Sequence, residues 1–285
     1  MDQRHDVRRS QIGIGIPITS IRKTYSMIYF LSDLHLGSLA FENKIAHQNK
    51  VIKLLEHMGH DASAIYLLGD VFDFWHEYFW RDCSKKTFEP LFRTIRHLVK
   101  RGVKVHFFTG NHDMWTYGEL QKLTGMIMHY SPCTVTLKNK SIYLAHGDGL
   151  LPSNIDKLYP LEVQKKIRSF IRLRAFFYNP IPRFMYRCMP PFLGNALGYN
   201  WAKHSRLKEL ANPLAYKGED KEELILFAKE MEQTYHHDYY IFGHRHIDLD
   251  LQIAPASRVI ILGDCFKLFT YAQMDHEGNI EMKTV

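Results

Sequence analysis

Hydrophobic residues occur along the chain in short runs that alternate with longer segments of helical periodicity. A short apolar run bounded by polar residues and glycine is typical of a strand buried in a sheet. Six runs predict such strands: Met27–Ser32, Ala64–Leu68, Val103–Thr109, Ser141–Ala145, Tyr239–Phe242 and Val259–Leu262. Near the end of the sequence, residues 268–273 and 279–283 flank a polar turn and predict a closing β-hairpin.

Two segments between the predicted strands have the spacing of amphipathic helices. In residues 42–59 and 88–100 the apolar side chains recur at i, i+3 and i+4, which places them on one face of a helix. Such a helix buries its apolar face against a sheet. The alternation of strands and helices therefore predicts a layered α/β domain.

The composition excludes several classes of protein. Of the 285 residues, 46% are hydrophobic and 24% are charged, which is ordinary for a globular domain and argues against a disordered, collagen-like or coiled-coil chain. No apolar run approaches the roughly 20 residues that a membrane-spanning helix needs. No apolar segment follows Arg4, Arg8 and Arg9, as it would in a secretory signal.

The cysteines indicate a reducing compartment. There are four of them, Cys83, Cys133, Cys188 and Cys265, and none forms a CxxC pair. Isolated cysteines suggest neither a disulfide framework nor a zinc ribbon. We therefore expect a cytoplasmic protein.

Charge is distributed unevenly along the chain and marks an insertion. Residues 151–217 interrupt the rhythm of strands and helices with prolines and with aromatic and basic helical pieces. They carry twelve Lys and Arg against three Asp and Glu, a net charge of +9, whereas the whole chain carries +7. We predict a domain over residues 27–285 that contains an inserted helical cap at residues 151–217. Residues 1–26 form a basic extension, either a disordered tail or sequence upstream of a functional start at Met27.

The strongest chemical signal lies at the ends of the predicted strands. Five strands are followed by Asp, His or Asn, with glycine beside nearly all of them, in these blocks: Asp33-Leu34-His35, Gly69-Asp70, Gly110-Asn111-His112-Asp113, His146-Gly147-Asp148 and Gly243-His244-Arg245-His246. Ligands bind outside the carboxyl ends of strands in open α/β sheets, so the blocks are expected to converge on one crevice. Any one block has an ordinary explanation, such as a turn or a core histidine. Five blocks of the same chemistry predict a site.

These residue types predict a metal centre with two ions. Asp, His and Asn without a thiolate suit Mn, Fe, Zn or Co alike. The candidate ligands are Asp33, His35, Asp70, Asn111, His146, His244 and His246. They exceed the three or four protein ligands of a single catalytic zinc ion. Two ions about 3.5–4 Å apart, bridged by one carboxylate, would use all of them, and Asp70 is the natural bridge.

The ordered motifs D-x-H, GD, GNHD, HGD and GHxH resemble those of the calcineurin-like metallophosphoesterases over residues 27–262. The resemblance implies a four-layer αββα fold of two facing mixed sheets. It also implies two divalent ions, with manganese the expected metal. Asp33, His35 and His246 would bind one ion and Asn111, His146 and His244 the other, with Asp70 between them. An activated water would then attack phosphorus in line with the leaving group.

The same resemblance assigns a catalytic role beside the ligands. His112 corresponds to the family histidine that donates a proton to, or polarises, the phosphoryl or leaving oxygen. Asp113 would orient His112. The alternative is that His112 only supports the neighbouring ligands.

The stretch Gly69–Trp75 adds a further acid and three aromatic residues. Asp73 is predicted to be either an acceptor for a ligand histidine or a helix cap. The aromatic residues are expected to pack under the site or along its groove: Phe72, Phe74 and Trp75.

The insertion lies between the HGD and GHxH blocks, so we expect it to cover the metal crevice as a lid. It combines its net charge of +9 with many Phe, Tyr and Trp residues. An apolar groove edged with cations suits an anionic amphiphile, with acyl chains against the aromatics and phosphates against Arg and Lys.

Together with GDxFDxW and HGDG, such a cap resembles the family of UDP-2,3-diacylglucosamine pyrophosphatases of lipid A biosynthesis. The resemblance implies hydrolysis of this nucleotide-sugar lipid to UMP and 2,3-diacylglucosamine 1-phosphate, peripherally on the cytoplasmic face of the inner membrane and without a nucleic-acid partner. The implied substrate contacts are Lys203, Ser205 and Arg206 in the cap and Asn111, His112 and His244 at the metals. A solvated helix face is the alternative for the cap segment. The best-known members carry Arg in place of His112.

Two other functions remain open. A metallophosphoesterase that acts on nucleotides or nucleic acid would also need a basic surface with aromatic residues. Such an enzyme would show strong salt dependence and cleave DNA or RNA. A non-catalytic scaffold that binds a membrane or a partner could have kept the fold, but the seven candidate ligands and His112 argue against it.

Overall fold

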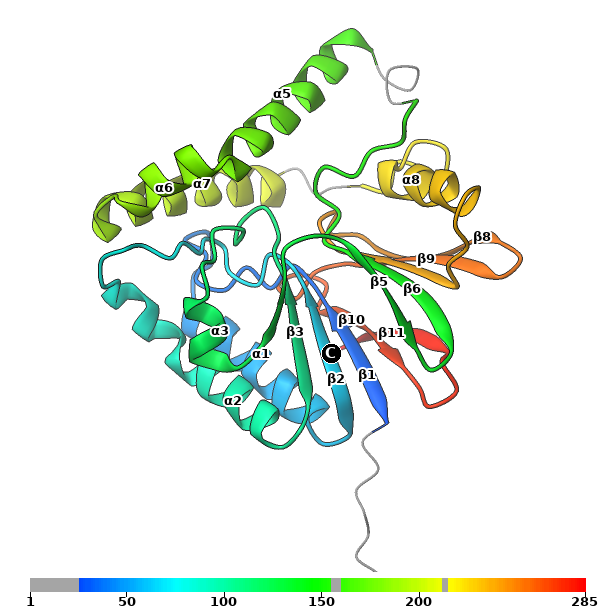
Figure 1. Cartoon of the computed structure of the whole chain (residues 1–285), viewed down its shortest axis with the longest axis horizontal. Coiled ribbons are helices and arrows are strands. Elements are labelled where there is room, and N and C mark those ends of the chain that lie inside the picture. The colour runs from blue at the N-terminus through cyan, green and yellow to red at the C-terminus, as the bar shows by residue number, and fades with distance from the viewer. Residues whose placement is uncertain (1–25, 155–159, 212–214) are drawn as a thin grey trace, which may run out of the picture.

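Two β-sheets face each other, and helices cover their outer sides (Figure 1). This arrangement comes from a computed structural model that describes residues 26–154, 160–211 and 215–285. The strands are β1 (Met27–Leu31), β2 (Ala62–Leu68), β3 (Lys104–Phe108), β4 (Ile127–His129), β5 (Cys133–Leu137), β6 (Lys140–Ala145), β7 (Tyr239–Phe242), β8 (Asp248–Ala254), β9 (Ser257–Leu262), β10 (Thr270–Met274) and β11 (Ile280–Thr284).

Both sheets contain parallel and antiparallel pairs. The first has six strands in the order β11-β10-β1-β2-β3-β4, and the second has five in the order β5-β6-β7-β9-β8. In the first sheet β1 pairs parallel with β2 and antiparallel with β10. In the second sheet β6 pairs parallel with β7 and antiparallel with β5. The predicted four-layer αββα fold with two mixed sheets is therefore confirmed.

The helices are α1 (Lys44–Met58), α2 (Glu89–Lys100), α3 (Glu119–Thr124), α5 (Leu161–Tyr178), α6 (Pro180–Arg187), α7 (Pro191–Ala211) and α8 (Glu223–Glu232).

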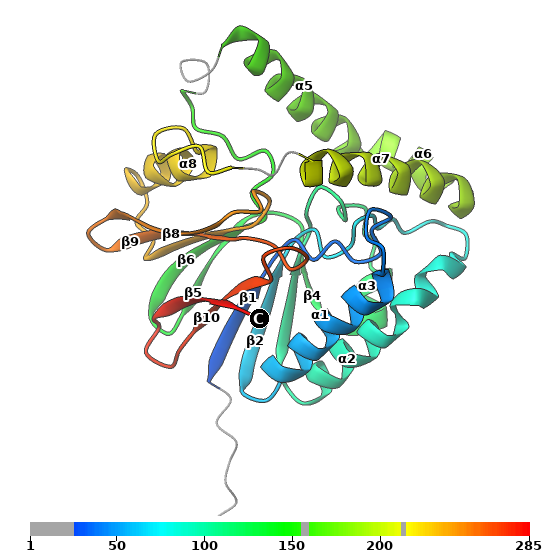
Figure 2. The same cartoon turned by 180° about the vertical axis from the view of Figure 1, so that it is seen from behind.

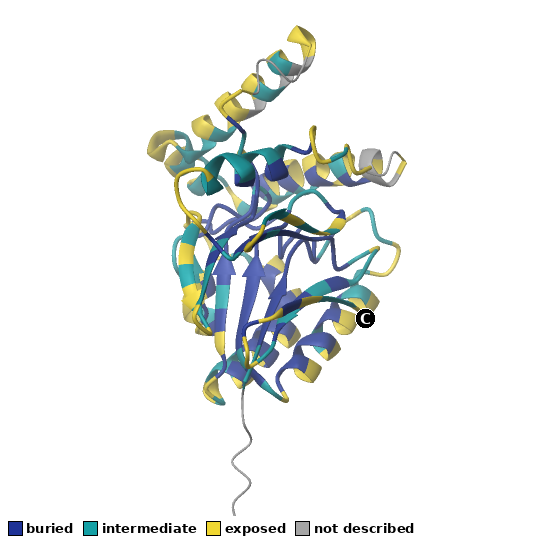
Figure 3. Ribbon diagram, turned by 90° about the vertical axis from the view of Figure 1, so that its right-hand side faces the viewer, coloured by how far each residue is buried: buried dark blue, intermediate teal, exposed yellow. Residues whose placement is uncertain are grey.

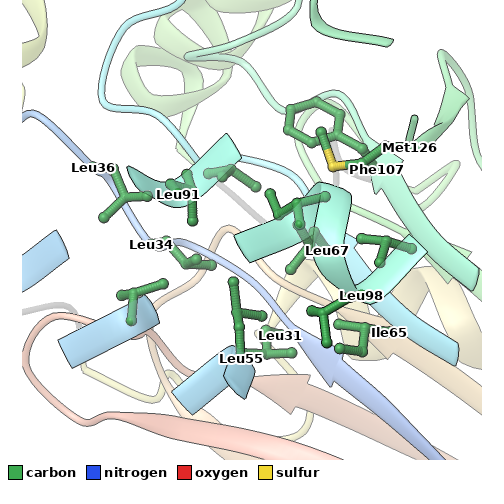
Figure 4. Packing of buried hydrophobic residues seen from close by; sticks show 14 of the residues in the cluster. Leu31, Leu34, Leu36, Leu55, Ile65, Leu67, Leu91, Leu98, Phe107 and Met126 are labelled. Atoms are coloured by element: carbon green, nitrogen blue, oxygen red, sulfur yellow. The ribbon is translucent and has the colours of Figure 1, made fainter. Parts of the chain in front are cut away.

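Apolar side chains fill the space on both sides of the first sheet. Leu55 of α1 and Leu98 of α2 pack against Leu31 and Leu67 of the sheet (Figure 4). Phe30, the neighbour of Leu31, points to the opposite side and packs between the sheets. This alternation is the period of two that a strand imposes on its side chains.

The outer face of the second sheet is covered by α8. Leu224 and Ile225 of this helix pack against Tyr240 and Phe242 of β7. Figure 3 shows that the strands of both sheets are largely buried, whereas the helices above them are mostly exposed or half-buried. No helix in the described ranges is both long and apolar enough to cross a membrane.

All six predicted strands, both predicted helices and the closing hairpin are present. The sequence patterns did not predict β4, β5, β8, α3 or α8. Edge strands β4, β5 and β8 are half exposed, so their apolar runs are short or interrupted by polar residues. The 3₁₀ helix at residues 83–88 was not predicted either.

Three helices lie above the ends of the sheets, within the predicted insertion (Figures 1 and 2). We call α5, α6 and α7 the cap. The side chain of Asn179 accepts a hydrogen bond from the Ile181 N–H, and Pro180 occupies the first turn of α6. Both features are typical of a helix start, and they explain the sharp turn between α5 and α6. The division into a core domain and a cap remains a prediction, and residues 1–25 of the predicted extension lie outside the described residues.

Candidate metal centre

The candidate ligands lie on strand-end turns with an unusual backbone. Five of the seven have positive φ angles although they are not glycine: Asp33 (54°), His35 (44°), Asp70 (50°), His244 (67°) and His246 (50°). This left-handed region is costly for residues with a Cβ atom, and it concentrates at functional sites where the surrounding structure enforces it. The sequence blocks therefore turn sharply so that their side chains face a common point.

Backbone hydrogen bonds join the turns to one another. The Asp33 N–H donates to the carbonyl of Gly69 over 3.1 Å, and the His35 N–H donates to the carbonyl of Asp70 over 2.9 Å. The His244 N–H donates to Asp33 Oδ2 over 2.8 Å. Two backbone hydrogen bonds and one bond to the Asp33 carboxylate thus tie three separate strand ends together.

Two glycines allow these turns to approach each other closely. A Cβ atom on Gly110 would lie 2.2 Å from Asp70 Oδ1, and one on Gly243 would lie 1.8 Å from Ser32 Oγ. Neither separation is possible for real atoms. Any other residue at these two positions would push the turns apart.

Asp33, His35 and His246 form the first group of candidate ligands. His246 Nε2 lies 3.0 Å from Asp33 Oδ1, and His35 Nε2 lies 3.7 Å from the same oxygen. Their ligand atoms all lie within 4.8 Å of one another, and the residues are buried. The structure therefore brings together the three residues that were predicted to hold one ion.

Asp70, Asn111 and His146 form the second group. His146 Nε2 lies 3.4 Å from Asp70 Oδ2 and 3.3 Å from Asn111 Oδ1. The other ring nitrogen, Nδ1, donates to the carbonyl of Leu68 over 2.8 Å, which leaves Nε2 as the ligand atom. The His244 ring lies 5.2 Å from the His146 ring. Asp70 also lies 3.9 Å from His35 Nε2, so it stands between the two groups as a bridge would.

The donor atoms of this centre fit divalent ions. Asp33 Oδ1 and His35 Nε2 are buried and have no hydrogen bond of acceptable geometry among the described residues. Buried polar atoms are costly unless something satisfies them, and a metal ion does so. Burial raises the pKa of the Asp33 carboxyl, but His246 and His35 outweigh this and hold the pKa well below its ordinary value. Burial and the neighbouring His146 lower the pKa of His244 to about 3, which keeps its imidazole neutral, as a metal ligand must be.

His112 lies within the centre, and two hydrogen bonds fix its backbone and its ring. Its backbone N–H donates to Asp70 Oδ1 over 2.9 Å, and its Nδ1 donates to the backbone carbonyl of Asp73 over 2.7 Å. Because a carbonyl only accepts, Nδ1 carries the proton and Nε2 is the atom that faces the ligands, 3.9 Å from Asp70 Oδ2. The ring centroid lies 5.3 Å from that of Trp201 in the cap.

Asp113 does not orient His112 as predicted. Its carboxylate accepts hydrogen bonds from the backbone N–H groups of Val71, over 2.8 Å, and Gly110, over 2.7 Å. The group that bonds the His112 ring is the Asp73 carbonyl. Asp113 lies after a sharp turn, so its side chain points back into the two strand-end loops and fixes them. Burial and the charge of Asp70 raise the pKa of Asp113 to about 7.

Asp73 lies beside a ligand histidine, as the first of the two roles predicted for it requires. Its Oδ1 lies 3.3 Å from His35 Nδ1, on the side of the ring away from the ligand atom. Arg206 Nε lies 3.7 Å from the same oxygen, and Arg206 Nη1 lies 3.4 Å from His246 Nδ1. Asp73 Oδ1 and His35 Nδ1 have no hydrogen bond of acceptable geometry among the described residues, so the acceptor role stays a prediction. Arg206 of the cap lies close to both Asp73 and His246.

The three substrate contacts predicted in the cap differ in how far they are buried. Arg206 is buried, Ser205 is half-buried and Lys203 is exposed. The alternative of a solvated helix face therefore describes Lys203, whereas Arg206 points toward the metal ligands. The aromatic residues of the stretch Gly69–Trp75 differ as well, because Phe72 and Trp75 join the core under the first sheet and Phe74 packs against the cap.

An apolar cavity of about 300 Å³ lies between the cap and the metal centre. Asn111 and Arg174 are its charged or amide residues, and the other lining residues are apolar or aromatic: Phe74, Met114, Trp115, Leu173, Phe177, Tyr186, Leu197, Gly198 and Trp201. The predicted aromatic groove under the cap thus exists and opens onto a candidate metal ligand.

Sequence reasoning missed one loop of the site. Asp264 accepts hydrogen bonds from the N–H groups of Lys267, over 2.6 Å, and Leu268, over 2.9 Å. The resulting turn places the Phe266 ring 5.6 Å from His35 and 5.3 Å from His246. The signal was present, because Gly263-Asp264 comes directly after the predicted strand Val259–Leu262, just as the other blocks come after theirs. Arg174 was also not singled out, since nothing in its sequence surroundings separates it from the other cap cations.

Comparison with known proteins gives a family and close relatives. A family model described as calcineurin-like phosphoesterase matches residues 26–248. A UDP-2,3-diacylglucosamine hydrolase from Porphyromonas gingivalis is 36% identical over 88% of this chain and 94% of the relative. A protein of the same name from Aeromonas hydrophila is 27% identical over 84% of this chain and 90% of the relative.

Among solved structures, a dimetal phosphatase from Danio rerio aligns with 91% of this chain and 96% of its own, at 13% identity and a TM-score of 0.43. The family match and the relative at 36% identity show that this chain belongs to the calcineurin-like phosphoesterase family and is a metal-dependent phosphoester hydrolase.

Proposed function

We propose that this protein hydrolyses the pyrophosphate bond of UDP-2,3-diacylglucosamine and releases UMP and 2,3-diacylglucosamine 1-phosphate. The observation that carries the proposal is the apolar cavity of about 300 Å³ that begins at Asn111 and extends under the cap. Its volume is at the lower end of the range of ligand pockets. A nucleotide or a phosphoprotein has no apolar chain that would need such a cavity, whereas a diacylated sugar does.

The residues of the centre support this chemistry. Asp33, His35 and His246 would hold one divalent ion, Asn111, His146 and His244 would hold the other, and Asp70 would lie between them. Two such ions, when bound, neutralise phosphoryl oxygens and lower the pKa of a water molecule toward about 7. We propose manganese for both positions, and metal analysis of the purified protein tests this choice.

His112 is proposed as the catalytic group next to the ions. Its Nδ1–H is committed to the Asp73 carbonyl, so Nε2 is the atom available to a phosphoryl or leaving oxygen. Trp201 packs beside the ring. Asp113 supports the two loops that carry the ligands.

We further propose that the protein works at the cytoplasmic face of the inner membrane. On α6, Ile181, Phe184 and Met185 are exposed at 70%, 60% and 67%, and the half-buried Arg183 and Arg187 lie on the same helix. Apolar side chains flanked by cations suit an anionic bilayer surface. Flotation with vesicles that contain anionic lipid should carry the protein upward, and neutral vesicles should carry less of it.

The decisive experiment is product analysis by phosphorus NMR and mass spectrometry. The purified protein is incubated with Mn²⁺ and detergent-dispersed UDP-2,3-diacylglucosamine. UMP together with the acylated sugar phosphate is the expected result. Intact lipid, combined with cleavage of nucleotides or polynucleotides, would overturn the proposal and favour the alternative nucleotide or nucleic-acid phosphoesterase.

A further inference from the structure

Arg174 of α5 lies at the junction of two cavities. It is the only cation among the described residues that line the apolar cavity next to Asn111. It also lines a smaller, more polar cavity of about 140 Å³ that includes His146, Thr109 and Asp148. Asn111 and His146 are adjacent candidate ligands, with Oδ1 and Nε2 only 3.3 Å apart. Arg174 therefore approaches one side of the metal centre from the cap.

The guanidinium group is held in place before any substrate arrives. Its Nε donates to Asp148 Oδ2 over 2.5 Å, and Asp148 is buried in the HGD loop. The group also lies 4.5 Å from the centre of the Tyr178 ring. A Cβ atom on Gly149 would lie 3.3 Å from Arg174 Cδ, so the loop leaves room for this side chain and little more. An arginine fixed in this way loses little conformational entropy when it binds a ligand.

The guanidinium still has donors to offer. Its contacts among the described residues use Nε, toward Asp148, and Nη2, which lies 3.5 Å from the Tyr178 hydroxyl. The planar group carries five N–H donors, and its geometry matches phosphate oxygens. The side chain is 31% exposed, so a ligand in either cavity can reach it.

The position of Arg174 matches one part of the proposed substrate. A pyrophosphate has two phosphates, and the one that is attacked must sit on the metal ions. The other phosphate, if it carries the diacylated sugar, must lie between the ions and the apolar cavity. We infer that Arg174 binds this second phosphate, which remains on the lipid product, and that Asp148 and Tyr178 position it. This inference rests on the proposed function.

The competing explanation is that Arg174 only fastens the cap to the HGD loop through Asp148. A fastening role would loosen the cap and disturb the loop that carries His146, so its loss would weaken every acylated ligand, with or without a phosphate. Recognition of the second phosphate would affect only substrates that possess one. The two roles therefore differ in whether the loss depends on the phosphate of an acylated ligand.

The test compares the lipid pyrophosphate with bis(p-nitrophenyl) phosphate, a small diester that has one phosphate. A charge-assisted hydrogen bond to phosphate corresponds to about a 10- to 100-fold change in kcat/KM. Arg174→Gln should lower the ratio of lipid to diester kcat/KM by at least about tenfold. Arg174→Lys, which keeps the charge and loses the planar fork, should lower it less. Arg172→Gln, a matched control on the same helix at an exposed position, should leave the ratio unchanged.

A second measurement is product inhibition. 2,3-Diacylglucosamine 1-phosphate should inhibit the Arg174→Gln variant about tenfold less strongly than the unaltered protein, whereas inhibition by 2,3-diacylglucosamine, which has the acyl chains and no phosphate, should change little. An equal loss on both substrates, an equal loss of inhibition by the two acylated sugars, or the same change in the Arg172→Gln variant would overturn the inference and leave Arg174 as a fastening residue. If the unaltered protein cleaves the diester but not the lipid, the proposed function itself fails and the inference falls with it.

Discussion

The ion pair between Glu222 and Arg245 should stabilise the loop Gly243–His246 in its observed conformation. Arg245 stands between the candidate ligands His244 and His246. Its Nε and Nη2 donate to the two carboxylate oxygens of Glu222 over 2.5 and 3.1 Å. The Glu222 side chain is fully buried and the Arg245 side chain is 11% exposed. The pair ties the loop to the start of α8, where the chain returns from the cap.

Glu222→Ala would leave a mostly buried guanidinium without this carboxylate. Removing one partner of a buried pair costs about 3–5 kcal/mol, because the remaining charge is left desolvated. We expect the free energy of unfolding to fall by that amount. We also expect weaker metal binding, because both histidines of the loop have left-handed backbones that only their surroundings enforce.

The assay is urea denaturation with and without Mn²⁺, combined with metal titration by calorimetry. The matched control is the next residue, since Glu223 pairs with Lys217 over 2.6 Å at a more exposed position. Glu223→Ala should cost about 1 kcal/mol or less, as exposed pairs do. A double-mutant cycle with Arg245→Ala isolates the coupling between Glu222 and Arg245. Equal effects of Glu222→Ala and Glu223→Ala, with metal affinity intact in both, would refute the reasoning.

The site supports three more predictions. His112→Ala should lower kcat by about 10²- to 10⁴-fold with the metal content unchanged, and loss of metal by mass spectrometry would instead make His112 a ligand. Asp70→Asn should reduce the metal content and abolish hydrolysis of every phosphoester, because it weakens the only carboxylate that lies between both ligand groups in the described site; full activity would argue for the non-catalytic alternative. Deleting residues 157–210 should abolish cleavage of the lipid but spare some hydrolysis of bis(p-nitrophenyl) phosphate, and surviving lipid cleavage would show that the cap does not form the acyl site.

Periodicity predicted the central elements well because burial on both sides of a strand leaves an uninterrupted apolar run. The strands β1, β2 and β7 are almost wholly buried, and each was predicted nearly to the residue. The strands β4, β5 and β8 carry exposed or half-exposed residues, so solvent accepts polar side chains there and the pattern weakens. Helix α8 was not predicted because its ten residues contain one continuous apolar run, Leu224–Ala228, in place of the i, i+3, i+4 spacing of an amphipathic helix.

The sequence by itself determined the candidate ligands. Asp33, Asp70, Asn111, His146 and His244 lie within three residues of the end of a strand, and strands that end at the same sheet edge bring the residues after them to one place. No knowledge of side-chain packing was needed for that step, because strand polarity alone decides which edge the blocks occupy. Glycine beside nearly every block supplied the further hint that the turns approach closely.

Only the tertiary structure decided which cap residues reach those ligands. Lys203 and Arg206 lie three positions apart on α7, yet the first is exposed and the second contacts Asp73 and His246. Arg174 and Arg172 are separated by two positions on α5, and only Arg174 lines the cavities. The rotation and crossing of a helix over a core are set by ridges and grooves of many side chains, and no local pattern encodes them. For the same reason the partner of the His112 ring is the Asp73 carbonyl, a backbone group that any residue at position 73 would supply.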